Sequence, residues 1–435
     1  MAEGKGRLTT ELAAFASGAV MPTGTARQVA MLSALDWLAV GRAGCDEPVA
    51  RILRDQAAEE GGALQSRLFG GGAAPAHMAA LVNGTISHAL DYDDTHFAHI
   101  GHPSVAVFPA ALAMGERQQT SVADVLEAAL VGMELSIRVG LWLGRNHYQT
   151  GFHQTATAGA FGATAAAGRI AGLNADQMAH ALGLASTRAA GLKAQFGTMG
   201  KPYNAGLAAS CGVEIALLVA RGFQATPNAM EGEFGFGATH HGAGDETEAL
   251  AGLGDVWLFE QVSHKFHACC HGLHAALEAG RALDLAAPEI AELTVRTHPR
   301  WMSVCNQLAP MTGLGAKFSY RTVLAMLALG YDTAKLETYD DRICADPRLD
   351  PLRDLIRVEA DESLGETEAV LLVLRRDGAR LEQRHDLSAP MELTAREARV
   401  REKAESLIGE KTARAIWSLL RGGGQAVDLG ALLAD

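Results

Sequence analysis

One short stretch of the chain, residues 88–105, concentrates the residue types that move protons. It reads HALDYDDTHFAHIGHPSV and lies between two apolar segments. Its carboxylates and imidazoles are Asp91, Asp93, Asp94, His88, His96, His99 and His102. Charged groups this close repel unless each has a partner, and such crowding drives pKa values apart. We therefore favour a proton-transfer site over the alternative interpretation, which is a solvated loop or an Asp-rich helix cap.

A second candidate is His153, which follows Gly151 and Phe152 and precedes an Ala/Gly-rich segment. A histidine at the start of a helix could face a cavity and shuttle a proton, or it could be a capping or core residue. The sequence leaves both interpretations open. Gly159, Gly162 and Gly168 follow, but the spacing is wrong for a dinucleotide fingerprint and no strand precedes them, so they predict helix packing.

Lys201 stands in the segment GTMGKPYNAGLAA and is followed by Pro202. Proline disfavours helical backbone in the preceding residue, so we expect Lys201 to lie in a turn just before a helix. A lysine near a helix N-terminus is unfavourable by itself. With an anion bound there, the lysine and the exposed backbone N–H groups would cooperate, which predicts an anion-binding role.

The segment HKFHACCHGLH, residues 264–274, is rich in histidine. If it were helical, His267, His271 and His274 would share one face and could bind zinc. The segment lacks the glutamate of the HExxH motif, so the general base of that class is missing. The competing interpretation, which we favour, is a set of imidazoles that line an anion pocket beside Lys265.

The bulk properties narrow the class of protein. The chain has 435 residues, 48% of them apolar, and a net charge of −13. Such a charge disfavours nucleic acid as a partner, since phosphate binding needs clustered Lys and Arg. The N-terminal sequence lacks an apolar stretch of signal-peptide length, and no uncharged run looks long enough to cross a membrane. Six scattered cysteines suit a reduced chain, so we expect a cytoplasmic protein.

Two regions of different periodicity must position these residues. From residue 9 to about 254, apolar residues recur every three to four positions, which predicts an all-helical region. Later segments alternate with period two, or flank the hairpin signal Asp377-Gly378, and predict strands. The expected strands are 292–298, 355–359, 368–375 and 380–385. From residue 394 the pattern is helical again, so residues 1–260 with 394–435 form the helical domain, and 261–393 an inserted α+β domain.

Four stretches, in this order, resemble the MmgE/PrpD family, which includes 2-methylcitrate dehydratase, cis-aconitate decarboxylase and iminodisuccinate epimerase. They are HALDYDDTHFAHIGHPS, GFHQTATAGAFGA, GKPYNAGLAA, and HKFHACCHGLH with the later AKFS. The resemblance implies a mainly α fold, a large helical domain with a smaller α+β lid domain inserted before the C-terminal helices. It also implies a homodimer that works without a metal or other cofactor.

Within the family pattern, Asp91, Thr95, His102, His153, Lys201 and Lys265 match site residues. The tripeptide HPS stands one residue later than in the decarboxylase pattern. The histidine of that pattern therefore corresponds to either His99 or His102. Decarboxylase-like members carry a tyrosine soon after AKFS, where this chain has Thr322, with Tyr320 nearby. This departure favours a dehydratase over a decarboxylase.

Together, the residues and the resemblance predict a lyase that transfers protons at a carbon next to a carboxylate. The substrate class is a small di- or tricarboxylate, because the chemistry needs an acid and a base across the carbon and fixed cations for the developing charge. The catalytic set is predicted to be His102, His153, Asp91 and Lys201. The substrate-binding set is predicted to be Thr95, Asp94, His99, Lys265 and His271. The alternatives are an epimerase of an amino- or imino-dicarboxylate such as iminodisuccinate, a non-catalytic ligand-binding protein, and thirdly a zinc hydrolase.

Overall fold

The structure is a computed structural model that describes residues 6–242 and 244–434. The chain divides into two compact units, Met1–His264 with Leu393–Asp435, and Lys265–Glu392. The described residues of the first unit are mainly helical, whereas the second unit contains a four-stranded mixed sheet with short helices. The predicted fold class, mainly α with an α+β part, is confirmed.

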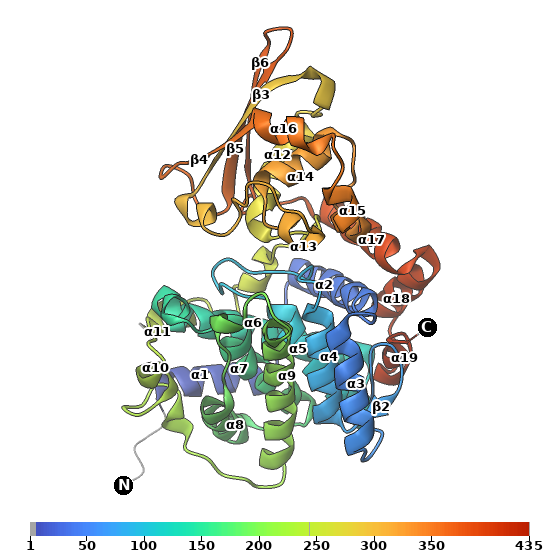
Figure 1. Ribbon diagram of the computed structural model, residues 1–435. Coiled ribbons are helices and arrows are strands. Elements are labelled where there is room, and N and C mark those ends of the chain that lie inside the picture. The colour runs from blue at the N-terminus through green and yellow to red at the C-terminus, as the bar shows by residue number, and fades with distance from the viewer. Residues whose placement is uncertain (1–5, 243, 435) are drawn as a thin grey trace. The chain divides into compact units, whose positions relative to one another are not determined.

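The first unit is a bundle of helices with one two-stranded ribbon, β1 (Ser66–Arg67) and β2 (Ala73–Ala74) (Figure 1). Two of its helices begin with a capping box: the side chains of Ser121 and Asn174 each accept a hydrogen bond from the backbone N–H three residues further along the chain. The main helices are α1 (Arg7–Ser17), α2 (Gly24–Ala43), α3 (Pro48–Glu60), α4 (Ala76–His88), α5 (Pro103–Gln118), α6 (Val122–Thr150), α7 (Gln154–Ile170), α8 (Ala175–Arg188), α9 (Gly200–Val219), α17 (Leu393–Ile408), α18 (Glu410–Gly422) and α19 (Ala426–Ala431).

Small residues allow the central helices α4, α6, α7 and α9 to approach closely. A Cβ placed on Gly162 would lie 2.4 Å from the carbonyl oxygen of Gly132, and one on Gly206 would lie 2.3 Å from that of Leu81. Backbone atoms cannot move aside as a flexible side chain can, so these positions accept only glycine without a shift of a helix. The helix-packing interpretation of the glycines after His153 is therefore confirmed, and the resulting rigidity fixes the helix ends that carry the site.

The helix α9 is long and apolar enough to cross a bilayer by composition alone. In the bundle, 67% of that stretch is buried, and α9 packs against α4 and α7. Burial on several sides by protein explains the apolar composition, since a helix that is hydrophobic all round is expected in the core of a large domain.

Three predicted boundaries differ from the structure. The apolar pattern that starts at residue 122 predicts a helix ending at residue 143, but α6 runs on to Thr150, with Gly144 in a non-helical conformation at φ 69°. The sequence also predicts one helix over residues 315–329, but the structure has two, α13 (Gly313–Ala316) and α14 (Tyr320–Ala328), and Ser319 caps the second. The helix α9 begins at Gly200, so Lys201 lies in its first turn, and the prediction that Lys201 lies in a turn just before the helix was wrong.

The second unit is built on a sheet of order β4-β3-β5-β6 (Figure 1). The strands are β3 (Ile290–Thr297), β4 (Ile356–Ala360), β5 (Glu368–Arg375) and β6 (Arg380–Asp386), and each lies within two residues of the range predicted from the sequence. The strand β3 pairs parallel with β4 and antiparallel with β5, and β5 and β6 form the hairpin expected at Asp377-Gly378. The helix α12 (His274–Ala282) packs against β5 and β6, and α16 (Leu349–Leu355) leads directly into β4.

Candidate active site

The loop between α4 and α5 carries the cluster of acids and imidazoles. The helix α4 ends at His88 and α5 begins at Pro103, so both ends of the loop are held by packed helices. Asp91 has a φ of 52°, in the left-handed region that aspartate tolerates better than most residues. The loop is also held from α7, because Thr155 Oγ1 accepts a hydrogen bond from the backbone N–H of His102.

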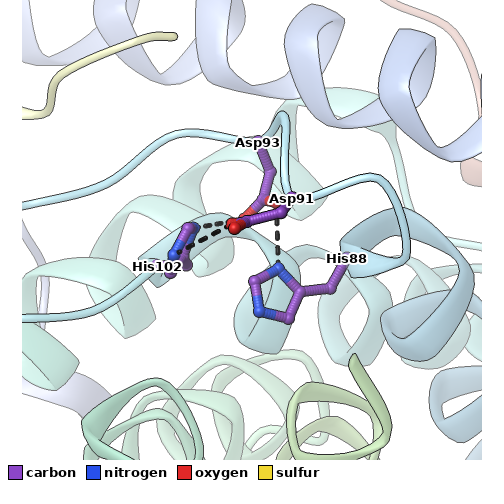
Figure 2. Close-up of side chains that lie close together, drawn as sticks. All are labelled: His88, Asp91, Asp93 and His102. Atoms are coloured by element: carbon purple, nitrogen blue, oxygen red, sulfur yellow. Dashed lines mark hydrogen bonds and ion pairs between the residues drawn. The ribbon is translucent and has the colours of Figure 1, made fainter. Parts of the chain in front are cut away.

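Asp93 stands at the centre of the cluster, between two imidazoles (Figure 2). Its Oδ1 lies 2.9 Å from His88 Nδ1, and its Oδ2 lies 2.7 Å from His102 Nδ1. The second contact is close but angled rather than linear. Burial acts to raise the pKa of Asp93, but the two imidazoles outweigh it and hold the pKa well below its usual range. Asp93 is therefore a buried carboxylate, and its partners hold both imidazole rings in place.

Asp91 and Lys201 form the more open side of the cluster. Lys201 Nζ lies 2.8 Å from Asp91 Oδ2, and Asp91 Oδ1 lies 3.7 Å from His102 Nε2. The Asp91 side chain is 34% exposed, whereas that of Asp93 is fully buried. Because Lys201 is in the first turn of α9, its ammonium group adds to the positive end of the helix dipole. A substrate carboxylate would meet two cooperating positive groups here.

His153 enters the cluster from the start of α7. It occupies the N-cap position, but its side chain makes no capping hydrogen bond, so the capping interpretation does not apply. Asn204 Nδ2, from α9, lies 3.2 Å from His153 Nδ1, and the Phe196 ring meets the imidazole edge to face with centroids 5.0 Å apart. Burial, and then the electrostatic effect of His88, Lys201 and His102, lower the pKa of His153 well below its usual range. The imidazole is neutral at pH 7.

The four residues of the predicted catalytic set therefore lie together, although they come from three distant segments. His102 faces Asp91, Asp91 pairs with Lys201, and the positive charge of Lys201 acts on His153. The cluster therefore contains a neutral imidazole, an imidazole backed by a carboxylate, and an ammonium group. These groups can together remove a proton from a carbon next to a carboxylate.

Asp94, from the predicted substrate-binding set, is 1% exposed. Its Oδ2 accepts hydrogen bonds from the hydroxyls of Ser33 (2.8 Å) and Ser104 (2.6 Å), and its Oδ1 approaches the N–H of Ser104 in the first turn of α5. Burial raises the pKa of Asp94 to about 7. Direct contact with a substrate would require these hydroxyls to be displaced, so the helix-cap interpretation describes Asp94 better.

His99 and Thr95 occupy two further environments. His99 is fully buried against α6, where its Nε2 lies 3.5 Å from Ser136 Oγ, and burial lowers its pKa to about 3. The sequence did not decide whether His99 or His102 matches the family histidine. In the structure, His102 lies in the cluster and His99 packs in the helical core. Thr95 is half-buried, and its backbone pairs with that of Ser263.

Lys265 and His271 belong to the second unit. Lys265 is 2% exposed, and its charge acts on His274 and on the thiol of Cys269. The segment before α12 is not a continuous helix: only His271–Leu273 forms a 3-10 turn, so the three histidines do not share a helical face as the zinc interpretation required. Both ring nitrogens of His267 have partners: Nδ1 lies 2.7 Å from Thr333 Oγ1, and Nε2 lies 3.1 Å from Glu278 Oε1.

Three residues of the cluster were missed by the sequence-based assignment: His88, Asp93 and Asn204. His88 and Asp93 were visible as members of the acidic stretch, but nothing in their spacing distinguished them from Asp94 or His96. Asn204 follows Lys201 by three positions, and residues at that spacing share one face of a helix. Had α9 been predicted to start at Gly200, this spacing would have pointed to Asn204.

One group of side chains has the composition of a metal site. Among the residues that the structure describes, His88, Asp91, Asp93 and His102 can each bring one ligand atom within 4.8 Å of the others. The same donors, however, already contact one another, and the Lys201 ammonium lies 2.8 Å from Asp91. A divalent cation bound here would lie beside that ammonium and would replace these contacts.

Comparison with known proteins identifies relatives of both units. The model of the MmgE/PrpD N-terminal domain matches residues 10–248, and that of the MmgE/PrpD C-terminal domain matches residues 267–417. A cis-aconitate decarboxylase of Aspergillus terreus is 34% identical over 226 residues, 49% of this chain and 46% of the relative. The human cis-aconitate decarboxylase is 33% identical over 198 residues, 44% of this chain and 40% of the relative.

A 2-methylcitrate dehydratase of Cupriavidus necator is 26% identical over 310 residues, 66% of this chain and 63% of the relative. The chain spans about half the length of the decarboxylases that it matches. All the residues of the cluster, from His88 to Asn204, fall inside the matched N-terminal domain.

Proposed function

Because the chain belongs to the MmgE/PrpD family, we propose that it is a lyase that acts on a small di- or tricarboxylate. The observation that carries the proposal is the convergence of Asp91, His102 and Lys201, with His153 beside them, from three segments of the first unit. The relatives named above act, by their names, on aconitate and methylcitrate, which are carboxylates of this class.

In the proposed reaction, a proton leaves the carbon next to a substrate carboxylate. His102 accepts the proton, because its Nε2 is on the open side of the ring and its Nδ1 is backed by Asp93. Negative charge then develops on the carboxylate oxygens, where the Lys201 ammonium and the N-terminus of α9 stabilise it. Asp91 positions Lys201 and faces His102, so it couples the anion site to the base.

For the second half of the reaction we propose elimination of water, with decarboxylation as the second candidate. The Tyr320 hydroxyl, which stands near the position where decarboxylase-like members carry a tyrosine, is fully buried. It donates a hydrogen bond to the carbonyl oxygen of Gly272 at 2.6 Å and contacts Thr297 Oγ1 at 2.9 Å. A hydroxyl engaged in this way does not serve a substrate. The decarboxylases among the relatives favour the second candidate, since they match this chain at 34% and 33% identity, against 26% for the dehydratase.

We also propose that the reaction needs no metal, which the contact between Lys201 and Asp91 supports. Metal analysis of the purified protein tests this, together with activity after dialysis against a chelator. A stoichiometric metal whose removal abolishes turnover would contradict metal independence and would revive the zinc hydrolase. A homodimer is proposed on the resemblance alone, and a single-chain mass in light scattering would overturn it.

A substrate panel distinguishes the candidate reactions. The purified protein is incubated with citrate, 2-methylcitrate, cis-aconitate and the isomers of iminodisuccinate. New ultraviolet absorbance with hydroxy acids indicates dehydration, and release of carbon dioxide from cis-aconitate indicates decarboxylation. Deuterium uptake with change of optical rotation alone indicates the epimerase alternative.

If no polycarboxylate in the panel shows turnover or proton exchange, the lyase proposal fails. Binding of a polycarboxylate that is unaffected by His153→Ala, without turnover, would then favour the non-catalytic ligand-binding protein.

A further inference from the structure

We propose that Asp93 and Asn204 are positioning residues that hold His102 and His153 in opposite tautomers. His102 carries its proton on Nδ1 and presents a bare Nε2, whereas His153 carries its proton on Nε2. The inference deepens the proposed function and rests on it, because it assigns the proton acceptor and the hydrogen-bond donor of that reaction to particular nitrogen atoms. Neither Asp93 nor Asn204 is assigned contact with the substrate.

The tautomer of His102 follows from its distance to Asp93. An ionised carboxylate has only lone pairs to offer, so it can accept a hydrogen bond and cannot donate one. His102 Nδ1 lies 2.7 Å from Asp93 Oδ2, and two lone pairs at this separation would repel. The proton must therefore be on Nδ1, even though the contact is angled. Nε2 is left as the basic nitrogen, and it is the atom that faces Asp91 on the open side.

His88 keeps Asp93 in this orientation. Its Nδ1 lies 2.9 Å from Asp93 Oδ1, so the two oxygens of one carboxylate each hold one imidazole. The rings of His88 and His102 meet edge to face, with centroids 4.6 Å apart. Because the Asp93 side chain is fully buried, it cannot turn to water, and rotation of its carboxylate would disrupt both imidazole contacts at once.

The tautomer of His153 follows from the orientation of the Asn204 amide. Asn204 Nδ2 lies 3.3 Å from the backbone carbonyl oxygen of Leu192, which can only accept a hydrogen bond. The atom beside it must therefore be the amide nitrogen, which fixes the way the amide points. The same nitrogen lies 3.2 Å from His153 Nδ1 and donates its second hydrogen there. Nδ1 is the acceptor, so the proton of the neutral imidazole is on Nε2.

Opposite tautomers give the two histidines different tasks. In the proposed dehydration, the C–H bond next to the carboxylate breaks, its proton binds His102 Nε2, and its electron pair enters the developing double bond. The C–O bond to the hydroxyl then breaks, and the proton on His102 leaves with the hydroxide as water. His153 remains neutral throughout and donates a hydrogen bond from Nε2 to a substrate oxygen, as a neutral imidazole can do without losing its proton.

The direct test is nuclear magnetic resonance of the full-length protein labelled with ¹⁵N-histidine, at neutral pH without substrate. A ring nitrogen that lacks a proton resonates far from one that carries a proton, and the spectra of His102→Gln and His153→Gln assign the signals. The expected result is a proton on Nδ1 of His102 and on Nε2 of His153. The reverse tautomer at either ring would overturn the inference. Since this measurement needs no turnover, its outcome is independent of whether the lyase assay succeeds.

Two variants test the positioning role itself. Asn204→Asp replaces the donor by an acceptor of the same shape, so the His153 proton should move to Nδ1. Asp93→Asn replaces one of the two carboxylate oxygens, which accept hydrogen bonds, by an amide NH₂ group, which donates them. Either His88 or His102 should therefore change tautomer. In both variants we expect kcat to fall by about 10–100-fold and KM to change by less than about threefold, because the affected groups orient others.

The matched control is Glu116→Gln, which changes a buried acid to an amide at the far end of α5. It should leave both tautomers and kcat unchanged. If Asn204→Asp or Asp93→Asn left the ¹⁵N spectrum unaltered, or lowered kcat no more than the control does, the positioning role would be excluded.

Discussion

Asp93 and Asp94 are neighbours in the chain, yet they lie in two regions of opposite character. Asp93 contacts two imidazoles beside Asp91 and Lys201, and its pKa is held low by those rings against the effect of burial. Asp94 contacts two hydroxyls, and burial raises its pKa to about 7. The difference shows that the partner, more than the burial, decides whether a carboxylate takes part in chemistry or in packing.

The region around Asp94 also contains a buried ion pair, which contacts the loop between α4 and α5. Lys403 Nζ, from α17, lies 2.6 Å from Asp36 Oδ1 and 2.6 Å from the carbonyl oxygen of Tyr92. Tyr92 stands between Asp91 and Asp93, so the C-terminal helix α17 fixes the backbone of the catalytic loop. Changes in the region around Asp93 should affect turnover, and changes in the region around Asp94 should affect folding.

The largest expected effect is on turnover, from His102→Gln. Removal of the base should lower kcat/KM by about 10²–10⁴-fold, the usual contribution of general acid–base catalysis. The change is measured by the absorbance assay on the best substrate of the panel, with the melting temperature as the control for folding. The assignment of His102 to catalysis would be contradicted if activity did not fall, or if it fell only because the variant is unfolded.

The next effect is on stability, from Lys403→Met. Loss of one partner leaves Asp36 as an uncompensated buried charge, which should lower the free energy of unfolding by about 3–5 kcal/mol. Urea unfolding followed by circular dichroism measures the change. The double variant Lys403→Met with Asp36→Leu should recover most of the loss, since no charge is then left buried. An unchanged free energy in the single variant would show that the pair does not support the loop.

Asp94→Asn should change how stability depends on pH. The folded-state pKa of Asp94 lies above its ordinary value, so the protonated form is favoured in the folded protein. The stabilisation is complete below about pH 4 and is lost as the pH rises through about 7. A rise from 3.8 to about 7 corresponds to about 4 kcal/mol over that window.

The asparagine variant has no such proton, so its unfolding free energy should vary less between pH 4 and pH 8 than that of the wild type. Urea unfolding at several pH values measures this difference. Parallel pH profiles for the two proteins would show that Asp94 is ionised in the folded state.

The smallest effect is expected from Ser33→Ala. This change removes one of the two hydroxyls that donate to Asp94, and a hydrogen bond of this kind contributes about 1–2 kcal/mol. The melting temperature should fall by a few degrees, while KM and kcat stay within about twofold. A large loss of kcat would join the two regions into one functional network and would end the distinction between them.

The sequence alone determined much of this protein. Apolar periodicity predicted the helices of the first unit. Strand-like segments and the hairpin signal Asp377-Gly378 predicted the four strands of the sheet within two residues, because these patterns are local. Four motifs indicated the family, and the catalytic set His102, His153, Asp91 and Lys201 could be named from them.

What only the tertiary structure decided is which atoms face one another. Neighbouring loop residues point to different environments, so Asp93 meets imidazoles and Asp94 meets hydroxyls, and no spacing rule distinguishes them. Asn204 and His153 are 51 positions apart, and their contact arises from the packing of α7 against α9. Hydrogen-bond partners, burial and tautomers depend on contacts between distant segments, and these exist only once the helices have packed.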